Sequence, residues 1–316
     1  MRLVRDARCG STSWLPMAEV IDSNRAKTLS VGVEPDIRMW HACAIGILTV
    51  WLYWPVIISL TGQWWHDPNW SHGFLVFAFS LFLLWKKRSQ LAAIPARPSW
   101  AGLAVIAGAL LTLTVGTLGA ELFLSRSSIV LLLAGFLIFF HGWLRFRALL
   151  FPWLLLFLMI PIPAIVFSQI TLPLQLLASR LASLSLTLLG IPVLREGNVL
   201  KLPVMSLAVA EACSGIRSLL SLGTLAVIYG YLSESRLAGR VFLLIAAIPI
   251  AVVANGSRIL VTGVLVQYWN PEAAEGFFHN FSGWVMFVFS LLMLVALHRV
   301  MQRLWPYKDS AEGQEN

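Results

Sequence analysis

The chain has 316 residues, of which 58% are hydrophobic and only 12% are charged, a composition that excludes an ordinary soluble domain. Its formal net charge of +8 does not indicate nucleic-acid binding, because the basic residues form short clusters between apolar runs. These runs approach the roughly 20 residues that a helix needs to cross a bilayer, and strand-like alternation is not evident. We therefore predict an all-α polytopic membrane protein.

Residues 1–38 are polar, rich in Arg and Ser, and lack the apolar core of a signal peptide. We predict that they form a disordered cytoplasmic extension, followed by a transmembrane domain over 39–305 and a cytoplasmic tail over 306–316. Hydropathy predicts eight spans, near residues 40–60, 72–86, 100–118, 127–143, 148–168, 213–232, 240–268 and 279–304.

The segment between the fifth and sixth spans has a different character. "SQITLPLQLLASRLASLSLTLLG" mixes leucines with polar residues around Arg180, which favours an interfacial helix, with a ninth crossing as the alternative. The following "IPVLREGNVLKLP" contains Gly, Pro and alternating Val and Leu, and it predicts a short hairpin at the membrane surface.

The distribution of Lys and Arg predicts the orientation of the spans. Of the 23 Lys and Arg residues, all but six fall on the side of the N-terminus, which predicts that both termini lie in the cytoplasm. The six on or near the outer side are Arg126, Arg180, Arg195, Lys201, Arg217 and Arg258.

This orientation places three chemically capable residues near the outer face. Cys213 opens the sixth span and His279 opens the eighth, both from the outer side. Arg258 lies about 18 residues into the seventh span, roughly 27 Å along the helix, and so near the same face. Each residue has a structural alternative: Cys213 as a packing residue, His279 as an interfacial anchor, and Arg258 as a tightly paired arginine.

Together the three residues predict an acyl-transfer site. A cysteine at a helix N-terminus beside arginine has a lowered pKa, and its thiolate is the nucleophile. A histidine can take the proton and return it to a leaving amine, while an arginine can stabilise the developing oxyanion. We therefore predict that Cys213, Arg258 and His279 are catalytic.

Four further residues are candidates for supporting the site or contacting substrate. Glu211 and Arg217 flank the thiol, either as a local ion pair or in orienting the site. Asn255, one turn before Arg258, could supply an amide partner or merely accompany a kink. His72 is a reserve candidate for proton transfer or substrate contact. Its loop "WWHDPNWSHGF" also offers His66 and Asp67, but their spacing is loose for metal, and we predict no metal or cofactor.

Four short motifs carry a resemblance to a known family. "EACSGIRS" around Cys213, "NGSR" ending at Arg258 and "HNFSGW" beginning at His279 resemble the ordered motifs of the exosortases, and "WSHGFLVF" at 70–77 resembles a further feature. The resemblance implies a membrane cysteine protease or transpeptidase, with those three residues as nucleophile, oxyanion binder and acid-base residue. It also implies membrane-anchored protein substrates that carry a Pro-Glu-Pro motif, a helix and a basic cluster, and an acceptor linked to surface polysaccharide or lipid.

Two other classes of function compete with this one. In a transporter, Arg258 and His279 would line a permeation path and Cys213 would serve packing. A membrane assembly factor for polysaccharide export would need no chemistry of its own. Internal inverted repeats would favour a transporter, and none is evident in the sequence.

Overall fold

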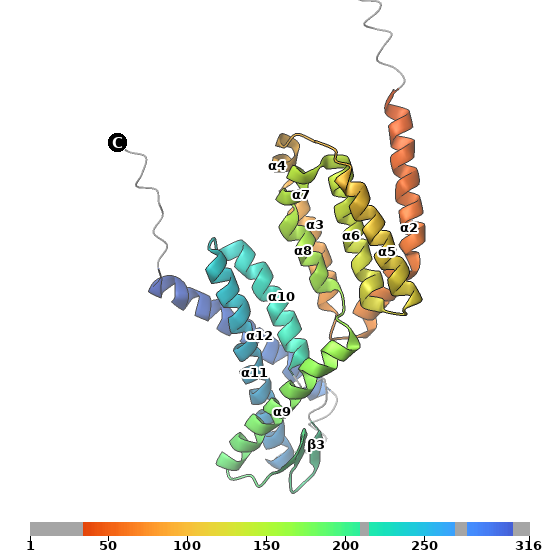
Figure 1. Ribbon diagram of the computed structural model, residues 1–316. Helices are drawn as coiled ribbons and strands as arrows, with labels where there is room; N and C mark the ends of the chain where they lie inside the picture. The colour runs from red at the N-terminus through yellow and green to blue at the C-terminus, as the bar shows by residue number, and fades with distance from the viewer. Residues whose placement is uncertain (1–33, 209–214, 269–276, 306–316) are drawn as a thin grey trace, which may run out of the picture. The chain divides into compact units, whose positions relative to one another are not determined.

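The computed structural model describes residues 34–208, 215–268 and 277–305 (Figure 1). The chain divides into two compact units, Met1–Pro55 and Val56–Asn316. Within the described residues, seven helices are long and apolar enough to cross a membrane. This confirms the predicted class, an all-α polytopic membrane protein.

The first helices follow the hydropathy pattern closely. The predicted span at 72–86 has the bounds of α3, and the one at 100–118 those of α5 to within a residue, while the first continues beyond its predicted end. α5 and α6 pack along each other. With 15 residues, α3 is about 22 Å long, which is shorter than the ~30 Å hydrocarbon core. These elements are α2 (Glu34–His66), α3 (His72–Lys86), α4 (Arg88–Ala93), α5 (Ala101–Leu118), α6 (Leu122–His141) and α7 (Trp143–Ala148).

The predicted fifth span, 148–168, is wrong as a continuous helix. The chain forms α8 (Leu150–Leu155) and a 3-10 helix, η1 (Leu156–Met159), and then leaves helical structure before α9 (Ala164–Leu188). Pro161 and Pro163 account for this break, since proline lacks a backbone N–H and disfavours helical conformation in the residue before it.

The segment predicted as an interfacial helix forms α9. α9 has 25 residues and is among the seven helices long and apolar enough to span a membrane, so its length and composition suit the predicted interfacial helix and the alternative of a ninth crossing alike. Its mean hydropathy stays high enough for this because Arg180 is a single charge near the centre of a long segment with apolar residues on either side.

The predicted hairpin is present, and its location at the membrane surface stays a prediction. β1 (Leu194–Glu196) pairs antiparallel with β2 (Val199–Lys201), and Gly197 in the turn has φ +61°. A third strand, β3 (Ser206–Ala208), extends the sheet on the other side of β2. The hydroxyl of Ser179 on α9 donates to the carbonyl of Gly197 at 3.0 Å, which fixes the hairpin against α9.

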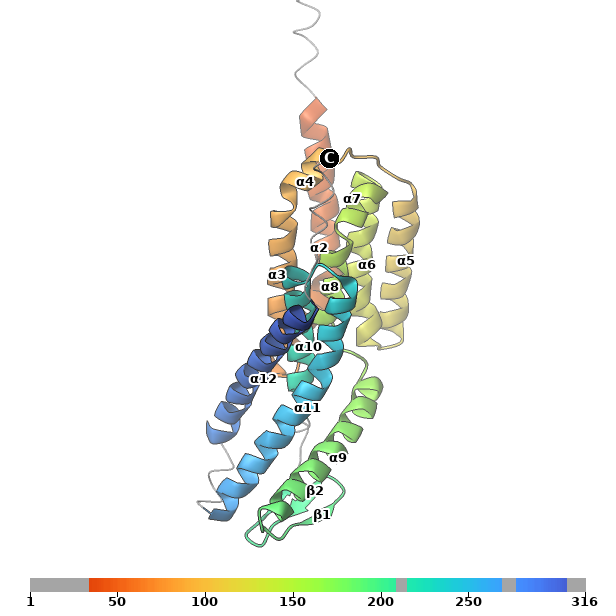
Figure 2. The ribbon, with the colours of Figure 1, turned by 90° about the vertical axis from the view of Figure 1, so that its left-hand side faces the viewer.

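Three C-terminal helices form the part of the fold that positions the site. α10 (Ile216–Ser233), α11 (Leu237–Tyr268) and α12 (Phe277–Leu304) pack together, and α11 also contacts α9 (Figure 2). Their shared core is apolar and contains several alanines, which permit close helix approach. It consists of Leu222 and Ala226 on α10, Leu243, Ala247, Ile250 and Ala251 on α11, and Leu294 on α12.

Candidate active site

The helical hairpin of α10 and α11 sets the position of Arg258. The two helices are joined by three residues, 234–236, so they run in opposite directions. α10 has 18 residues and is about 27 Å long, while Arg258 lies 21 residues after Leu237, about 32 Å along α11. Arg258 therefore lies near the end of the hairpin where α10 begins.

A close contact between α10 and α11 supports this placement. Gly215, the N-cap of α10, has φ +82°, a left-handed conformation that favours glycine. A Cβ at this position would lie 3.1 Å from the Cβ and 3.3 Å from the Nδ2 of Asn255. The backbone two residues after Cys213 thus lies against the amide side chain one turn before Arg258.

A second close contact joins Arg258 to α12. The Arg258 side chain is buried, with 8% of its surface exposed. A Cβ at Gly283 would lie 3.7 Å from the Cζ and the Nη2 of the Arg258 guanidinium. Gly283 lies four residues, about one helical turn, after His279. The guanidinium therefore lies beside the first turns of α12.

A cavity of about 410 Å³ connects these elements. It is lined by Arg217 and Ser218 of α10, Arg258 of α11, and Gly283 of α12. His72, the first residue of α3, lines the same cavity, although it is far from the other residues in the sequence. The structure thus brings together three of the predicted site residues, His72, Arg217 and Arg258.

His72 is held in a defined orientation. It is 8% exposed, and its Nε2 lies 3.2 Å from the carbonyl oxygen of Leu158. Because a carbonyl only accepts, Nε2 carries the proton in this hydrogen bond. His72 also lines a neighbouring, mainly apolar cavity of about 460 Å³ together with Trp70. His72 therefore lines two cavities, one that contains arginine side chains and one that is mainly apolar.

Arg217 is linked to the loop before α3. Its Nε donates to Oδ1 of Asn69 at 3.4 Å. The backbone N–H of Asn69 in turn donates to Oδ1 of Asp67 at 2.9 Å, which stabilises the turn of the loop. Sequence reasoning missed Asn69, although it lies between the two histidines of the loop that was already under consideration. It also missed Trp284, which lines the cavity next to Gly283.

Several predicted site residues fall outside this description. Cys213 and Glu211 lie outside the described residues. His279 belongs to the first turn of α12, and its side chain lies outside the description as well. Contacts among the side chains of Cys213, Arg258 and His279 therefore stay predictions, whereas Gly215 and Gly283 place neighbouring backbone beside Asn255 and Arg258.

The described residues lend no support to a metal site in the loop before α3. No group of three His, Cys, Asp or Glu side chains within the described ranges could hold a metal ion. His66 is exposed, and its Nδ1 lies 2.8 Å from the carbonyl of Gly62 on its own helix. Its environment is therefore different from that of His72.

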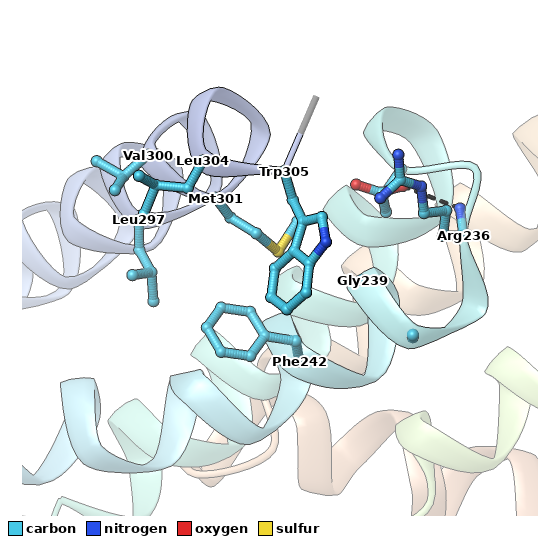
Figure 3. Close-up of a pocket in the computed structure, with 10 residues that line it drawn as sticks. Arg236, Gly239, Phe242, Leu297, Val300, Met301, Leu304 and Trp305 are labelled. Carbon is cyan, nitrogen blue, oxygen red and sulfur yellow. Dashed lines mark hydrogen bonds between the residues drawn. The ribbon is translucent and has the colours of Figure 1, made fainter. Parts of the chain in front are cut away.

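A further cavity of about 440 Å³ lies at the opposite end of the α10–α11 hairpin (Figure 3). Its walls are mostly apolar, with Phe242, Met301 and Trp305 prominent in the figure. Its charged lining residues are Glu234 and Arg236, and Oε1 of Glu234 accepts from the backbone N–H of Arg236 at 2.9 Å. This hydrogen bond holds the pKa of Glu234 below its ordinary value, against the opposing effect of burial. None of the described residues that line this cavity is a cysteine.

Glu234 is part of a buried polar network that links all three C-terminal helices. Its Oε2 lies 3.4 Å from the Nε2 of His298 on α12, and the Nδ1 of His298 lies 2.8 Å from the hydroxyl of Tyr229 on α10. Arg240 on α11 donates to the carbonyl of Glu234 at 2.7 Å. The network thus has an evident role in joining helix ends.

Comparison with known proteins identifies the class. The sequence profile of the transmembrane exosortase family (Exosortase_EpsH) matches residues 64–296. No curated protein and no solved structure shows a significant match. The matched range covers most of the chain, including α3, the residues that line the cavity, α10, α11 and α12 up to residue 296. The chain therefore belongs to the transmembrane exosortase family, a family of membrane proteases and transpeptidases, and it is a multi-pass membrane protein.

Proposed function

We propose that this protein is a cysteine protease and transpeptidase that processes membrane-anchored proteins bearing a C-terminal sorting signal. The observation that carries the proposal is the cavity in which Arg258 lies, between the backbone that follows Cys213 and the first turns of α12, which carries His279. In this proposal Cys213 is the nucleophile, Arg258 binds the carbonyl oxygen of the substrate, and His279 transfers protons.

The reaction would proceed through a thioester. His279 takes the proton of the Cys213 thiol, and the thiolate attacks the carbonyl carbon of the substrate peptide bond. The resulting oxyanion is stabilised by the fixed guanidinium of Arg258 in a site of low dielectric. The tetrahedral intermediate collapses, the C–N bond breaks, and His279 gives its proton to the departing amine. An external nucleophile then attacks the thioester and releases Cys213.

The position of Arg258 in the fold supports such a role. An arginine buried inside an apolar helix is costly, and Arg258 lines a cavity. The neighbouring Ser218 and Ser221 add small polar groups to the same wall. An extended peptide could therefore approach the guanidinium with polar partners for its backbone.

The proposed substrates carry a Pro-Glu-Pro motif, an apolar helix and a basic cluster at the C-terminus. The excess of Lys and Arg on the side of the N-terminus supports an orientation in the bacterial inner membrane with the cavity facing outward. In that orientation the basic cluster of a substrate would stay in the cytoplasm and its motif would reach the level of Arg258. The acceptor would be a nucleophile linked to polysaccharide or lipid.

Replacement of Cys213 by alanine tests the proposal. A tagged reporter with the sorting signal is co-expressed with the enzyme, and its processing is followed by immunoblotting. Cys213→Ala should leave the full-length reporter unprocessed, while Cys43→Ala, a change at an exposed cysteine of α2, should process it normally. Normal processing by Cys213→Ala at a matched membrane level would contradict the proposal.

A further inference from the structure

The cavity beside Arg258 has an unusual charge distribution. Two arginines, Arg217 and Arg258, and His72 line it, and none of its described lining residues is acidic. Cations in a cavity of low dielectric favour a ligand of opposite charge, because their attraction is weakly screened there. The cavity is therefore suited to an anionic group.

We propose that Arg217 binds a carboxylate side chain of the substrate close to the bond that is cleaved, and that it thereby determines specificity. This inference rests on the proposed function and assigns a partner to an arginine that the proposed reaction does not use. It divides the two cations between two tasks: Arg258 binds the carbonyl at the reacting bond, and Arg217 binds a charged side chain beside it.

The hydrogen bonding of Arg217 supports this assignment. Its Nε is occupied by Asn69. Among the described residues, the two ion pairs are Lys201 with Glu196 and His298 with Glu234, and neither involves Arg217. The edge formed by the two Nη atoms has the geometry that binds a carboxylate through two parallel hydrogen bonds. Asn69 would hold the guanidinium so that this edge is presented to a ligand.

The position of Arg217 in the sequence limits where this carboxylate can lie. Arg217 follows Cys213 by four residues, so at most about 14 Å of extended chain separates them. A substrate group that contacts Arg217 must therefore belong to a residue near the reacting bond. Arg217 and Arg258 belong to different helices and line the same cavity, so each can have its own partner on one substrate in this proposal.

The test compares reporters that differ only in the charge of the signal. Reporters with the motif glutamate, with Glu→Gln and with Glu→Lys are processed by the full-length enzyme in membranes, and initial rates are measured. The unmodified enzyme should process the glutamate reporter at least about tenfold faster than the glutamine reporter, as expected for a charge-assisted hydrogen bond. Arg217→Gln should lower the first rate and abolish the difference, whereas Arg217→Lys should keep part of it.

Reversing the charge of residue 217 gives the strictest test. Arg217→Glu should process the lysine reporter faster than the glutamate reporter, the reverse of the normal order. Arg195→Glu, a change at an exposed arginine of β1, is the matched control and should keep the normal order. If Arg217→Gln slowed both reporters equally, the ratio of the glutamate and glutamine processing rates would be unchanged. That result would overturn the inference. Cys213→Ala in the same assay distinguishes this failure from failure of the proposed function, which would appear as continued processing.

Discussion

The side chain of Asn255 on α11 lies against Gly215 at the N-cap of α10, where the backbone has φ +82°. This contact fixes the backbone just after Cys213 relative to the helix that carries Arg258. It therefore provides a physical link between two of the motifs by which the chain resembles exosortases.

Gly215→Ala should impair processing as well as stability. A left-handed residue with a Cβ costs about 1–2 kcal/mol, and here the Cβ would also press against Asn255 at 3.1 Å. Gly190→Ala is a matched control, because Gly190 has φ +79° but no neighbouring atom within 4 Å of the added Cβ. Both variants should lower the midpoint of thermal unfolding in detergent. Only Gly215→Ala should also lower the processing rate of the folded enzyme, and equal rates in the two variants would argue against the link.

Substitutions at Gly283 should depend steeply on size. In Gly283→Ala the added Cβ would make ordinary contact with the Arg258 guanidinium at 3.7 Å, so processing should stay near normal. Gly283→Leu should displace the guanidinium and reduce the rate by about tenfold or more. Gly108→Leu on α5 introduces the same side chain where no atom lies within 4 Å, and it should be neutral. Initial rates at equal membrane levels measure the effect; a normal rate in Gly283→Leu would show that Arg258 need not keep this position.

Arg258→Lys should be nearly inactive although it keeps the charge. Lysine lacks the planar fork of donors, and loss of a fixed donor to an oxyanion lowers the rate by about 10²–10³-fold. Arg126→Lys is the control. Arg126 is also buried, and its guanidinium donates to Gln63 and Ser59. That variant should lower thermal stability but keep most of the processing rate per folded molecule. Similar rate losses in both variants would indicate that arginine burial serves the fold in each case.

The stability of the three C-terminal helices should depend on pH through Glu234. Its pKa lies below the ordinary value of 4.5 in the folded protein, chiefly because of the hydrogen bond from the Arg236 backbone. Its ionised form is therefore stabilised by folding, and this contribution is complete above the unfolded pKa and is lost as pH falls through the lower folded pKa.

Glu234→Gln should remove this part of the pH dependence. The unfolding midpoint of the unmodified protein should fall more steeply below about pH 4.5 than that of the variant. Glu196→Gln breaks an exposed ion pair with Lys201 and should change the profile little, since exposed pairs contribute weakly. Parallel profiles for Glu234→Gln and the unmodified protein would show that the carboxylate contributes nothing on ionisation.

The sequence permitted prediction of most helices because apolar runs in a membrane protein have few alternative structures. The bounds of α3 were predictable since polar or basic residues flank the run at both ends. Pro161 and Pro163 indicate a break in the helix. Hydropathy did not predict this break, because the mean over a window stays high when two prolines lie among isoleucines. The polar residues of α9 lower its mean hydropathy, so hydropathy alone does not decide between an interfacial helix and a crossing.

For the candidate site, the sequence allowed prediction only of how far along its helix each residue lies. Counting residues from the α10–α11 connection placed Arg258 near the start of α10. The link between Arg217 and Asn69 joins residues 148 positions apart, and no local pattern encodes it. The same holds for His72, which lines the same cavity as Arg258 because α3 packs with η1 and α10. These relationships arise from tertiary structure alone.

The length of α11 makes the site sensitive to bilayer thickness. Its 32 residues span about 48 Å, whereas a hydrocarbon core is ~30 Å thick. When Leu237 lies at one boundary of the hydrocarbon, Arg258 lies about 32 Å away, at the other boundary. Longer lipid chains would draw the guanidinium into hydrocarbon or force α11 to change its tilt, and shorter chains would leave it in the headgroup region. The acyl chains of the host membrane therefore help to determine whether the cavity is wet.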